Sequence, residues 1–406
     1  MSRARRRGTR ARLLVLNQYY WPGVEATAYL LHDLCRQLVS EFDVTVITGM
    51  SADPDSVPGR TVKDGVEIVR VNSTSYDRRR LSRRAFNYVS YVGLSLLAAL
   101  RAEKPAVVLC MTDPPIIADI ALVVARRFRA PLVVISQDVF PEIAVELRRL
   151  ENRVVIAFLR ELIGFYLRRA DRVVAIGETM RDRLETKGAS RQRIRVIPNW
   201  VDTNAITPMP RDNDWAQEQG LDGKFVVMHS GNIGHAQNLD ALVRSATFLR
   251  DLDDLAIVLI GGGARRRELE QLTEVLEVPI VYLPYQPREM LSQSLSAADV
   301  HVVGLAKGLS GFVVPSRLYG ILAAGRPVIV AAEAASETVQ LVERVQCGVV
   351  VPPGRPEQLA LAIRDAHDGE FDLEDMGRRG REYVVSEADR AVAFRRYADL
   401  LHELVA

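Results

Sequence analysis

The stretch GLSGFVVPSRLYGILAAGRPVIV, residues 308–330, decides the fold. One apolar run, ADVHVVGL, ends just before it at Leu305, and a second begins at Pro327. Between them, a glycine-rich loop leads into a helix that starts at Pro315 or Ser316. Ser316 caps this helix if Pro315 precedes it, and it loses that role if Pro315 is the first helical residue. Strand, loop, helix and strand in this order are typical of an α/β domain.

The loop before this helix is a candidate anion site. A helix N-terminus offers free backbone N–H groups and the positive end of the helix dipole. Lys307, Arg317 and Arg326 add positive charge nearby. Such helix starts recur in α/β proteins, however, and most bind only water. The stretch alone leaves open both a phosphate site and an ordinary helix start.

Short apolar strands alternate with helical segments along the rest of the chain, which predicts parallel doubly wound sheets. A helix is expected over Thr27–Glu41. The series restarts after residues 201–223, which are rich in Pro, Asp and Asn and read as a linker. We therefore predict one domain over residues 1–200, a second over 201–385 and a C-terminal amphipathic helix over 386–406. The strands of the first series are RLLVLNQ, DVTVITG, GVEIVRV, AVVLCM, PLVVISQD, DRVVAIG and IRVIPN, and those of the second are FVVMHSG, LAIVLIGGG, PIVYLPY, ADVHVVGL, PVIVAA and CGVVVPPG.

The composition describes a folded, two-domain protein of 406 residues that is 48% hydrophobic. Its net charge of +2 is too small to indicate a nucleic-acid-binding protein. Three cysteines lack metal-ligand spacing and are expected to be buried in a reducing compartment. The N-terminus is basic, but the apolar run behind it is too short for a spanning helix. We expect a cytoplasmic protein, soluble or peripheral to the inner face of the plasma membrane.

The segment PSRLYGILAAGRPVI, residues 315–329, resembles the signature of GT4-type glycosyltransferases, in the branch acting in bacterial exopolysaccharide and O-antigen assembly. The resemblance covers nearly the whole chain. It implies an α/β protein of the GT-B fold: two doubly wound, Rossmann-like domains that face each other across a cleft. It places the nucleotide-sugar donor in the C-terminal domain and the acceptor in the N-terminal domain, onto which the last helix packs back.

The turn GNIGHAQN, residues 231–238, follows a buried strand and is a candidate for half of a diphosphate clamp. Its glycines permit close approach to a diphosphate, and the next helix supplies N–H donors. Many GT4 members carry an Arg and a Lys near this place, and this turn has neither. The residues expected to bind the donor here are Gly231, Asn232, Gly234, His235 and Gln237.

The turn LIGGGARRRELE, residues 259–270, does not fit the G-x-G-x-x-G pattern of a dinucleotide site. The resemblance instead places this turn near the donor nucleotide, with Gly262 and Gly263 in the turn and Arg265 as a phosphate or base contact. Arg266 and Arg267 are expected on a solvated face. Tyr285, at the next strand end, is expected to face the base.

The loop and helix at 308–326 depart from the family at one feature. Many GT4 enzymes carry two glutamates there, spaced E-x7-E, and the aligned residues are Phe312 and Gly320. Glu337 either substitutes for these carboxylates or caps the following helix. The donor residues expected in this part of the chain are Lys307, Pro315, Ser316, Arg317 and Glu337, with Arg317 also expected to be catalytic.

In the N-terminal domain, the segment ISQDVFPE ends a buried strand. Asp138 there can take a proton from an acceptor hydroxyl, hold a sugar, or merely cap the next helix; QD-x-x-P recurs at this place in the branch, which favours function. The residues expected on the acceptor side, besides the catalytic candidate Asp138, are Glu25, Asp113, Gln137 and Glu142.

Neither a metal nor another cofactor is expected. A GT-A transferase would show D-x-D at the end of an apolar strand, and the matches here lie in polar loops or the linker. The basic region 78–84 leads into an apolar helix and, with Arg168 and Arg169, suits anionic lipid, although a solvated charge run explains the same pattern.

The sequence thus predicts a metal-independent, retaining hexosyl- or N-acetylhexosaminyl-transferase, with retention implied by the resemblance. The donor is a nucleoside-diphosphate sugar, and the acceptor is a hydroxyl, expected on an undecaprenyl-diphosphate-linked glycan of cell-surface polysaccharide synthesis. Two alternatives remain: a sugar-nucleotide epimerase of the same architecture, and a non-catalytic GT-B scaffold at the membrane, which the absent glutamates favour.

Overall fold

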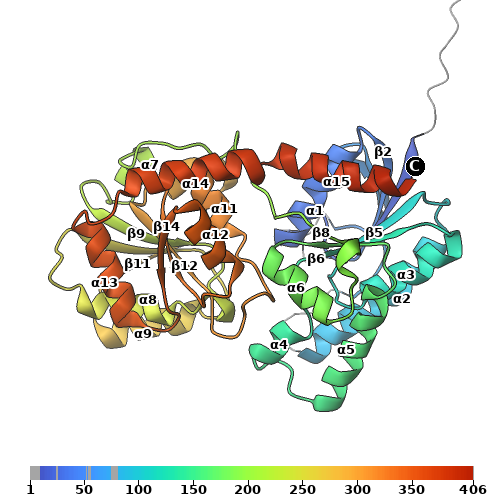
Figure 1. The fold of residues 1–406 in the computed structure, drawn as a ribbon, viewed down its shortest axis with the longest axis horizontal. Coiled ribbons are helices and arrows are strands. Elements are labelled where there is room, and N and C mark those ends of the chain that lie inside the picture. Colours follow the sequence, from blue (N-terminus) through green and yellow to red (C-terminus); the bar gives the residue numbers. More distant parts are fainter. Residues whose placement is uncertain (1–9, 24–25, 52, 54–55, 75–80, 406) are drawn as a thin grey trace, which may run out of the picture.

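The computed structural model describes residues 10–23, 26–51, 53, 56–74 and 81–405. It confirms two α/β domains, each built on a largely parallel sheet with helices on both faces (Figure 1). No helix among these residues is long and apolar enough to cross a membrane.

The N-terminal domain has an eight-stranded sheet in the order β3-β4-β2-β1-β5-β6-β7-β8. Neighbouring strands are parallel except for the pair β3–β4. The strands are β1 Ala11–Leu16, β2 Phe42–Thr48, β3 Gly59–Lys63, β4 Val66–Arg70, β5 Val107–Met111, β6 Leu132–Ser136, β7 Arg172–Ala175 and β8 Ile194–Val196. The helices are α1 Ala26–Leu38, α2 Leu81–Leu100, α3 Ile117–Phe128, α4 Glu142–Glu146, α5 Arg153–Leu167 and α6 Glu178–Thr186, with a 3-10 turn at Arg191–Arg193.

Two expectations for this domain were incomplete. Helix α1 ends at Leu38 and not at Glu41, because the chain turns there into the buried residue Phe42 at the start of β2. Strand β3 was missed because all five of its residues are exposed, which leaves no apolar alternation to read. It pairs with β4 through a turn at Asp64 and Gly65, both with positive φ, the conformation typical of a tight β-hairpin.

The two faces of the N-terminal sheet carry separate hydrophobic cores. One core joins the sheet to side chains of α2, α3, α5 and α6. The other joins it to α1 and to the C-terminal helix α15, Arg390–Val405. The parallel strands β5 and β6 are buried along their whole length, as sheets covered on both faces require.

The C-terminal domain has a six-stranded, all-parallel sheet in the order β11-β10-β9-β12-β13-β14. All six expected strands form: β9 Phe225–Ser230, β10 Leu255–Ile260, β11 Ile280–Leu283, β12 Val300–Gly304, β13 Val328–Ala331 and β14 Gly348–Val351. The helices are α7 Asp214–Glu218, α8 Asp240–Ser245, α9 Arg266–Leu276, α10 Leu291–Ser296, α11 Arg317–Ala323, α12 Glu337–Val345, α13 Pro356–His367 and α14 Leu373–Glu387, with 3-10 turns at His235–Gln237, Ala246–Phe248 and Arg288–Met290.

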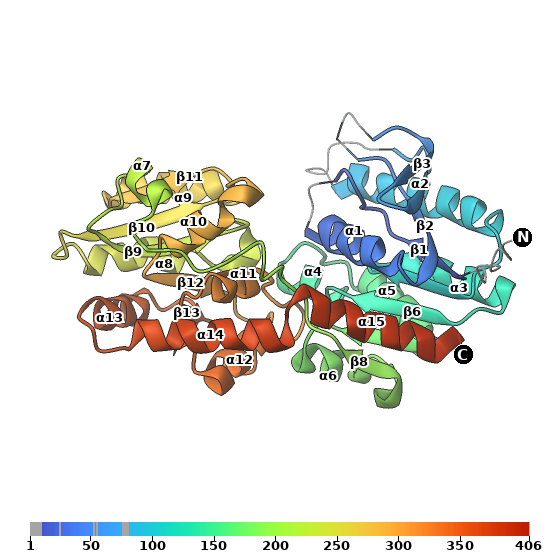
Figure 2. The same ribbon diagram turned by 90° about the horizontal axis from the view of Figure 1, so that it is seen from above.

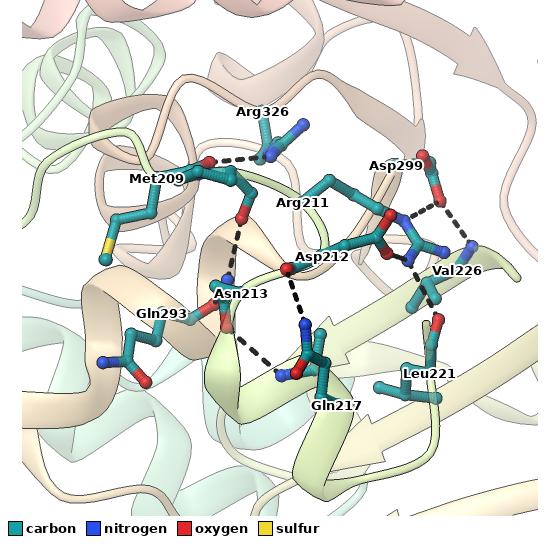
Figure 3. A network of polar contacts seen from close by, with 12 residues as sticks. Met209, Arg211, Asp212, Asn213, Gln217, Leu221, Val226, Gln293, Asp299 and Arg326 are labelled. Carbon is teal, nitrogen blue, oxygen red and sulfur yellow. Dashed lines mark hydrogen bonds and ion pairs between the residues drawn. The ribbon is translucent and has the colours of Figure 1, made fainter. Parts of the chain in front are cut away.

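The segment 201–223, expected to be a linker, is packed onto the C-terminal domain (Figure 3). Its helix α7 buries Trp215, which is 2% exposed. Arg211 donates to Asp299 at 3.1 Å and to the carbonyl of Leu221 at 2.9 Å. Arg326 donates to the carbonyl of Met209 at 3.1 Å. Arg326, which follows α11, therefore binds the segment 201–223. It was expected to add positive charge to the loop before α11.

The chain passes between the domains at residues 200 and 201 and again near 388. Trp200 packs in the core of the N-terminal domain, while Val201 belongs to a core of the C-terminal domain. Val201 donates to the carbonyl of Ala388 at 3.0 Å, so both crossings lie side by side. Helices α14 and α15 run along both domains (Figure 2), and α15 packs Phe394 and Tyr397 against Trp200.

Candidate active site

Two glycine turns meet at the carboxyl ends of β9 and β10. Gly231 and Gly261 have φ of +141° and +134°, a region that favours glycine. A Cβ at Gly261 would lie 1.9 Å from the carbonyl oxygen of Gly231, and one at Gly263 would lie 2.3 Å from that of Ile233. Any larger residue at Gly261 or Gly263 would push the two turns apart, so these glycines allow the two turns to pack against each other.

Arg317, the first residue of α11, lies over the first of these turns. A Cβ built on Gly231 would meet the Cδ, Nε and Nη1 atoms of Arg317, each at 3.8 Å. Nη1 lies 3.0 Å from Nε2 of the buried His229 at the end of β9. Nδ1 of His229 lies 3.4 Å from the carbonyl of Val302. Nη1 of Arg317 also lies 3.2 Å from Nδ1 of His229, so the guanidinium contacts both ring nitrogens.

The charge of Arg317 is not balanced by a carboxylate. None of the ion pairs between described residues includes Arg317. Burial lowers the pKa of Arg317 to about 10, which leaves it charged at neutral pH. Burial and the nearby Arg317 hold the pKa of His229 well below its ordinary value, so the imidazole is neutral. A half-buried cation with only a neutral partner is the arrangement that an anionic ligand completes.

The loop between β12 and α11 is held in place from several sides. Ala306 donates its N–H to the carbonyl of Ala236 in the first glycine turn, at 2.8 Å. Glu333, after β13, accepts from the N–H of Gly308 at 2.8 Å and from the hydroxyl of Ser310 at 3.1 Å. Glu333 was not among the expected site residues, because only the folded chain brings it to the loop. Its carboxylate fixes the start of the loop at Gly308 and Ser310, before the N-terminus of α11.

The same loop contacts the N-terminal domain directly. Asp138 and Val313 form an isolated antiparallel bridge, in which the N–H of Val139 donates to the carbonyl of Phe312 at 2.9 Å. Arg183 of α6 lies over the ring of Phe312, 4.8 Å from its centroid, and donates to the carbonyl of Ser310 at 3.3 Å. The structure therefore brings the two expected catalytic stretches together across the domains.

Apolar side chains pack at both positions of the missing E-x7-E glutamates, and Arg183 also lies over the ring at the first position, Phe312. Phe312 packs against the core of the N-terminal domain. A Cβ at Gly320 would contact the side chains of Leu295 and Ile206 at 3.7 and 3.9 Å. Ser316 has helical φ and ψ of −62° and −22°, and its side chain makes no cap bond to a described residue. Its expected capping role is therefore not realised.

Three expected ligands have partners within the protein. The amides of Gln137 and Asn199 form a reciprocal pair at 3.0 and 3.2 Å. Glu142 binds Lys187 at 2.6 Å and Arg160 at 3.1 Å. Burial alone would raise the pKa of Glu142, but these two bonds hold it below its ordinary value. The acceptor roles expected for Gln137 and Glu142 stay predictions, and both side chains have partners within the protein. Glu337 is the third, and it accepts from the N–H and the hydroxyl of Thr179 at 2.8 and 2.9 Å.

Partners also occupy several donor-side candidates. Arg265 pairs with Asp240 at 2.8 Å and with Glu268. Gln237 accepts from the N–H of Gly234 at 3.0 Å and so closes its own turn. Arg266, expected on a solvated face, donates to the carbonyl of Gly261 at 2.6 Å and fixes the second glycine turn.

The remaining candidates lie in loops that follow strands of the two sheets. Tyr285 is 59% exposed and donates to the carbonyl of Gly262 at 3.0 Å. Burial, followed by Arg149 and Arg265, lowers the pKa of His235. Lys307 is exposed beside the loop, and Asp113 is half-buried after β5. The side chain of Asn232 lies 2.8 Å from a Cβ built on Gly234. Pro315 is buried just before α11. Glu25 lies outside the residues that the structure describes. In the basic region 78–84, the structure describes neither residues 78–80 nor the side chains of residues 81–84.

No group of three His, Cys, Asp or Glu residues in the described part of the chain could hold a metal ion.

Comparisons with known proteins agree with this architecture. Residues 25–200 match the family model of the glycosyl transferase 4-like domain, and residues 211–383 match that of glycosyl transferases group 1. WbjE of Pseudomonas aeruginosa, named as a glycosyltransferase, is 26% identical to this chain over 404 residues. The match covers 98% of this chain and 99% of WbjE. WcaI of Escherichia coli, named as a colanic acid biosynthesis glycosyl transferase, is 30% identical over 49% of this chain and 50% of its own.

The crystal structure of Anabaena HepE in complex with UDP has the same fold, with a TM-score of 0.74 at 16% identity over 97% of this chain and 100% of HepE. The two family models cover both domains, and the chain therefore belongs to the glycosyltransferases that join a type 4-like N-terminal domain to a group 1 C-terminal domain.

Proposed function

We propose that this glycosyltransferase takes a hexosyl or N-acetylhexosaminyl group from a nucleoside-diphosphate sugar without a metal ion. The observation that carries the proposal is the uncompensated guanidinium of Arg317 over Gly231. A diphosphate placed there meets a fixed cation, the backbone of the glycine turn and the first turn of α11. As the sugar leaves, negative charge grows on the diphosphate, and a positioned cation stabilises that charge more in the transition state than in the ground state.

The donor and acceptor sides meet at the bridge between Asp138 and Val313. Asp138 lies at the carboxyl end of β6, where open α/β sheets bind their ligands. We assign to it the acceptor side of the reaction, either as the base for the acceptor hydroxyl or as a hydrogen-bond acceptor that orients it. Retention at the anomeric carbon is part of the proposal and rests on the resemblance to GT4 enzymes.

For the acceptor we propose a lipid-linked glycan of cell-surface polysaccharide synthesis, such as an undecaprenyl-diphosphate glycan. The name of WcaI, which refers to colanic acid biosynthesis, supports this class of product. Such an acceptor places the enzyme at the inner face of the plasma membrane.

The test is transfer from labelled UDP-, GDP- and dTDP-sugars to a lipid extract of bacterial membranes, with a chelator present. Label in the lipid fraction supports the transferase and identifies the donor, and NMR of the new linkage reports retention. Free donor converted to another sugar nucleotide without acceptor would replace the proposal with an epimerase. Absence of both transfer and donor binding, with metal restored, would replace it with a scaffold.

A further inference from the structure

Exposed apolar side chains are concentrated on three helices of the N-terminal domain. Nine of the seventeen large apolar residues that are exposed in the described chain lie on α2, α3 and α5. The most exposed are Val154 at 79%, Val89 at 65% and Phe158 at 64%. The others are Leu94, Leu97, Leu100, Val123, Val155 and Phe165.

These helices form one continuous face. Helix α3 packs between α2 and α5, and all three cover the same side of the N-terminal sheet, opposite α1 and α15 (Figure 1). On α2, residues 87–100 contain no charged residue, and Val89, Gly93, Leu97 and Leu100 follow one exposed stripe. The solvent face of a surface helix is ordinarily polar or charged, so this α2–α3–α5 face is built to be covered.

The charges on the α2–α3–α5 face are almost all positive. Residues 87–101, 117–129 and 153–169 contain eight arginines and two acidic residues, Asp119 and Glu161. Arg169 lies 3.8 Å from the ring centroid of Phe165, so a cation and an exposed aromatic ring occur together. The arginines, all exposed, are Arg101, Arg126, Arg127, Arg129, Arg153, Arg160, Arg168 and Arg169.

The chain that leads into the α2–α3–α5 face contacts the candidate active site. Helix α4 lies directly before α5 in the chain. The carboxylate of Glu146, in α4, lies 2.7 Å from a Cβ built on Gly308 in the loop between β12 and α11. Arg149, between the two helices, is close enough to His235 to lower its pKa. The segment that leads into α5 therefore contacts the C-terminal domain at Gly308 and lies near His235.

We propose that the α2–α3–α5 face docks on a phospholipid bilayer that contains anionic lipid. This deepens and rests on the proposed function, because a lipid-linked acceptor must reach the cleft from the bilayer. The apolar residues would enter the interface, and the surrounding arginines would lie at the level of the anionic headgroups. A second copy of the chain is a poor occupant, because it would bring eight more arginines against the first eight.

The first experiment is co-sedimentation of the full chain with vesicles of phosphatidylglycerol and phosphatidylcholine, compared with phosphatidylcholine alone. The proposal predicts binding to the anionic vesicles that weakens as salt rises. Phe158→Asp is expected to weaken binding by about tenfold or more, since it removes a large apolar side chain and adds a negative charge.

Val154→Asp and Val275→Asp form a matched pair, because both valines are 79% exposed on helices and only Val154 lies on the α2–α3–α5 face. Val154→Asp should lower vesicle binding, whereas Val275→Asp should leave it unchanged. Equal effects of the two substitutions, or equal binding to both kinds of vesicle, would overturn the proposal. So would sedimentation as a dimer that Phe158→Asp converts to a monomer.

Transfer to acceptor dissolved in detergent separates this proposal from the proposed function. Phe158→Asp should keep its turnover in detergent and lose turnover on acceptor in vesicles. Normal turnover in detergent without any vesicle binding would contradict the docking face alone. Vesicle binding without any donor turnover would contradict the proposed function alone.

Discussion

The N–H of Val139 donates to the carbonyl oxygen of Phe312 at 2.9 Å, and this bond joins the end of β6 in the N-terminal domain to the loop between β12 and α11. Val139 follows Asp138 just after the end of β6. Phe312 lies in the loop between β12 and α11, and Arg317 is the first residue of α11. Where many GT4 enzymes have a glutamate for the sugar, this chain has an aromatic residue that anchors the loop to the other domain.

Asp138→Asn should lower kcat by about 10²- to 10⁴-fold if Asp138 acts as the base. The affinity for the nucleoside diphosphate should stay unchanged, because the substitution keeps the backbone bridge to Val313. Initial-rate kinetics and calorimetric titration with the nucleotide measure the two effects. Near-normal kcat would remove Asp138 from the mechanism.

Glu337 and Thr179 should be energetically coupled across the domains. Their hydroxyl–carboxylate bond of 2.9 Å predicts a coupling free energy of about 1–2 kcal/mol in a double-mutant cycle of Glu337→Ala and Thr179→Val. Thr186→Val, on the same helix α6, is the control, because Thr186 bonds only within the helix to the carbonyl of Arg183. Equal coupling of Glu337 to both threonines, measured by chemical denaturation, would argue against a specific contact.

Gly261→Ala should disrupt the donor site. Its Cβ would lie 1.9 Å from the carbonyl of Gly231, and its φ of +134° strains any other residue. We expect a loss of stability of about 3 kcal/mol, together with weaker nucleotide binding. Gly93→Ala is the control, because a Cβ there meets nothing within 4 Å and should stabilise α2 by about 1 kcal/mol. Thermal unfolding distinguishes the two, and a stable, nucleotide-binding Gly261→Ala variant would contradict the packing of the turns.

Asp119 should make the protein less stable as pH rises. Both of its carboxyl oxygens are buried without a hydrogen-bond partner, and burial raises its pKa from 3.8 to about 7. Between these values the folded state retains a proton that the unfolded state releases, so stability falls as pH rises through the window. Asp119→Asn removes this dependence and should be more stable than the wild type at pH 8 by about 2 kcal/mol, after allowance for partial exposure. Urea unfolding at pH 5 and pH 8 measures the difference, and a gap that does not widen with pH would contradict it.

Much of the fold can be read from the sequence, because each buried parallel strand is a short apolar run and the series visibly restarts. The glycine turns and Arg317 could also be predicted as site residues, because they lie in segments that follow the ends of predicted strands. Strand β3 could not be read, because it is exposed throughout. The partners of Glu337 and Gln137 could not be read either, because they lie 158 and 62 residues away along the chain. Glu333 was missed because its role depends on the folded path of the loop.

We propose that the half-buried charge of Arg317 binds the diphosphate of the donor, and Arg317→Met is the variant that tests this role. Thermal unfolding and calorimetric titration with UDP, GDP and dTDP, all in chelator, would be run on the wild type, Arg317→Met and Arg364→Met, the last altering a surface arginine paired with Asp251. We expect Arg317→Met to keep or raise the unfolding temperature of the empty protein and to bind the preferred nucleotide about 100-fold more weakly. Arg364→Met should bind the nucleotide as the wild type does. Wild-type affinity in Arg317→Met, or no nucleotide binding by the wild type, would contradict the account.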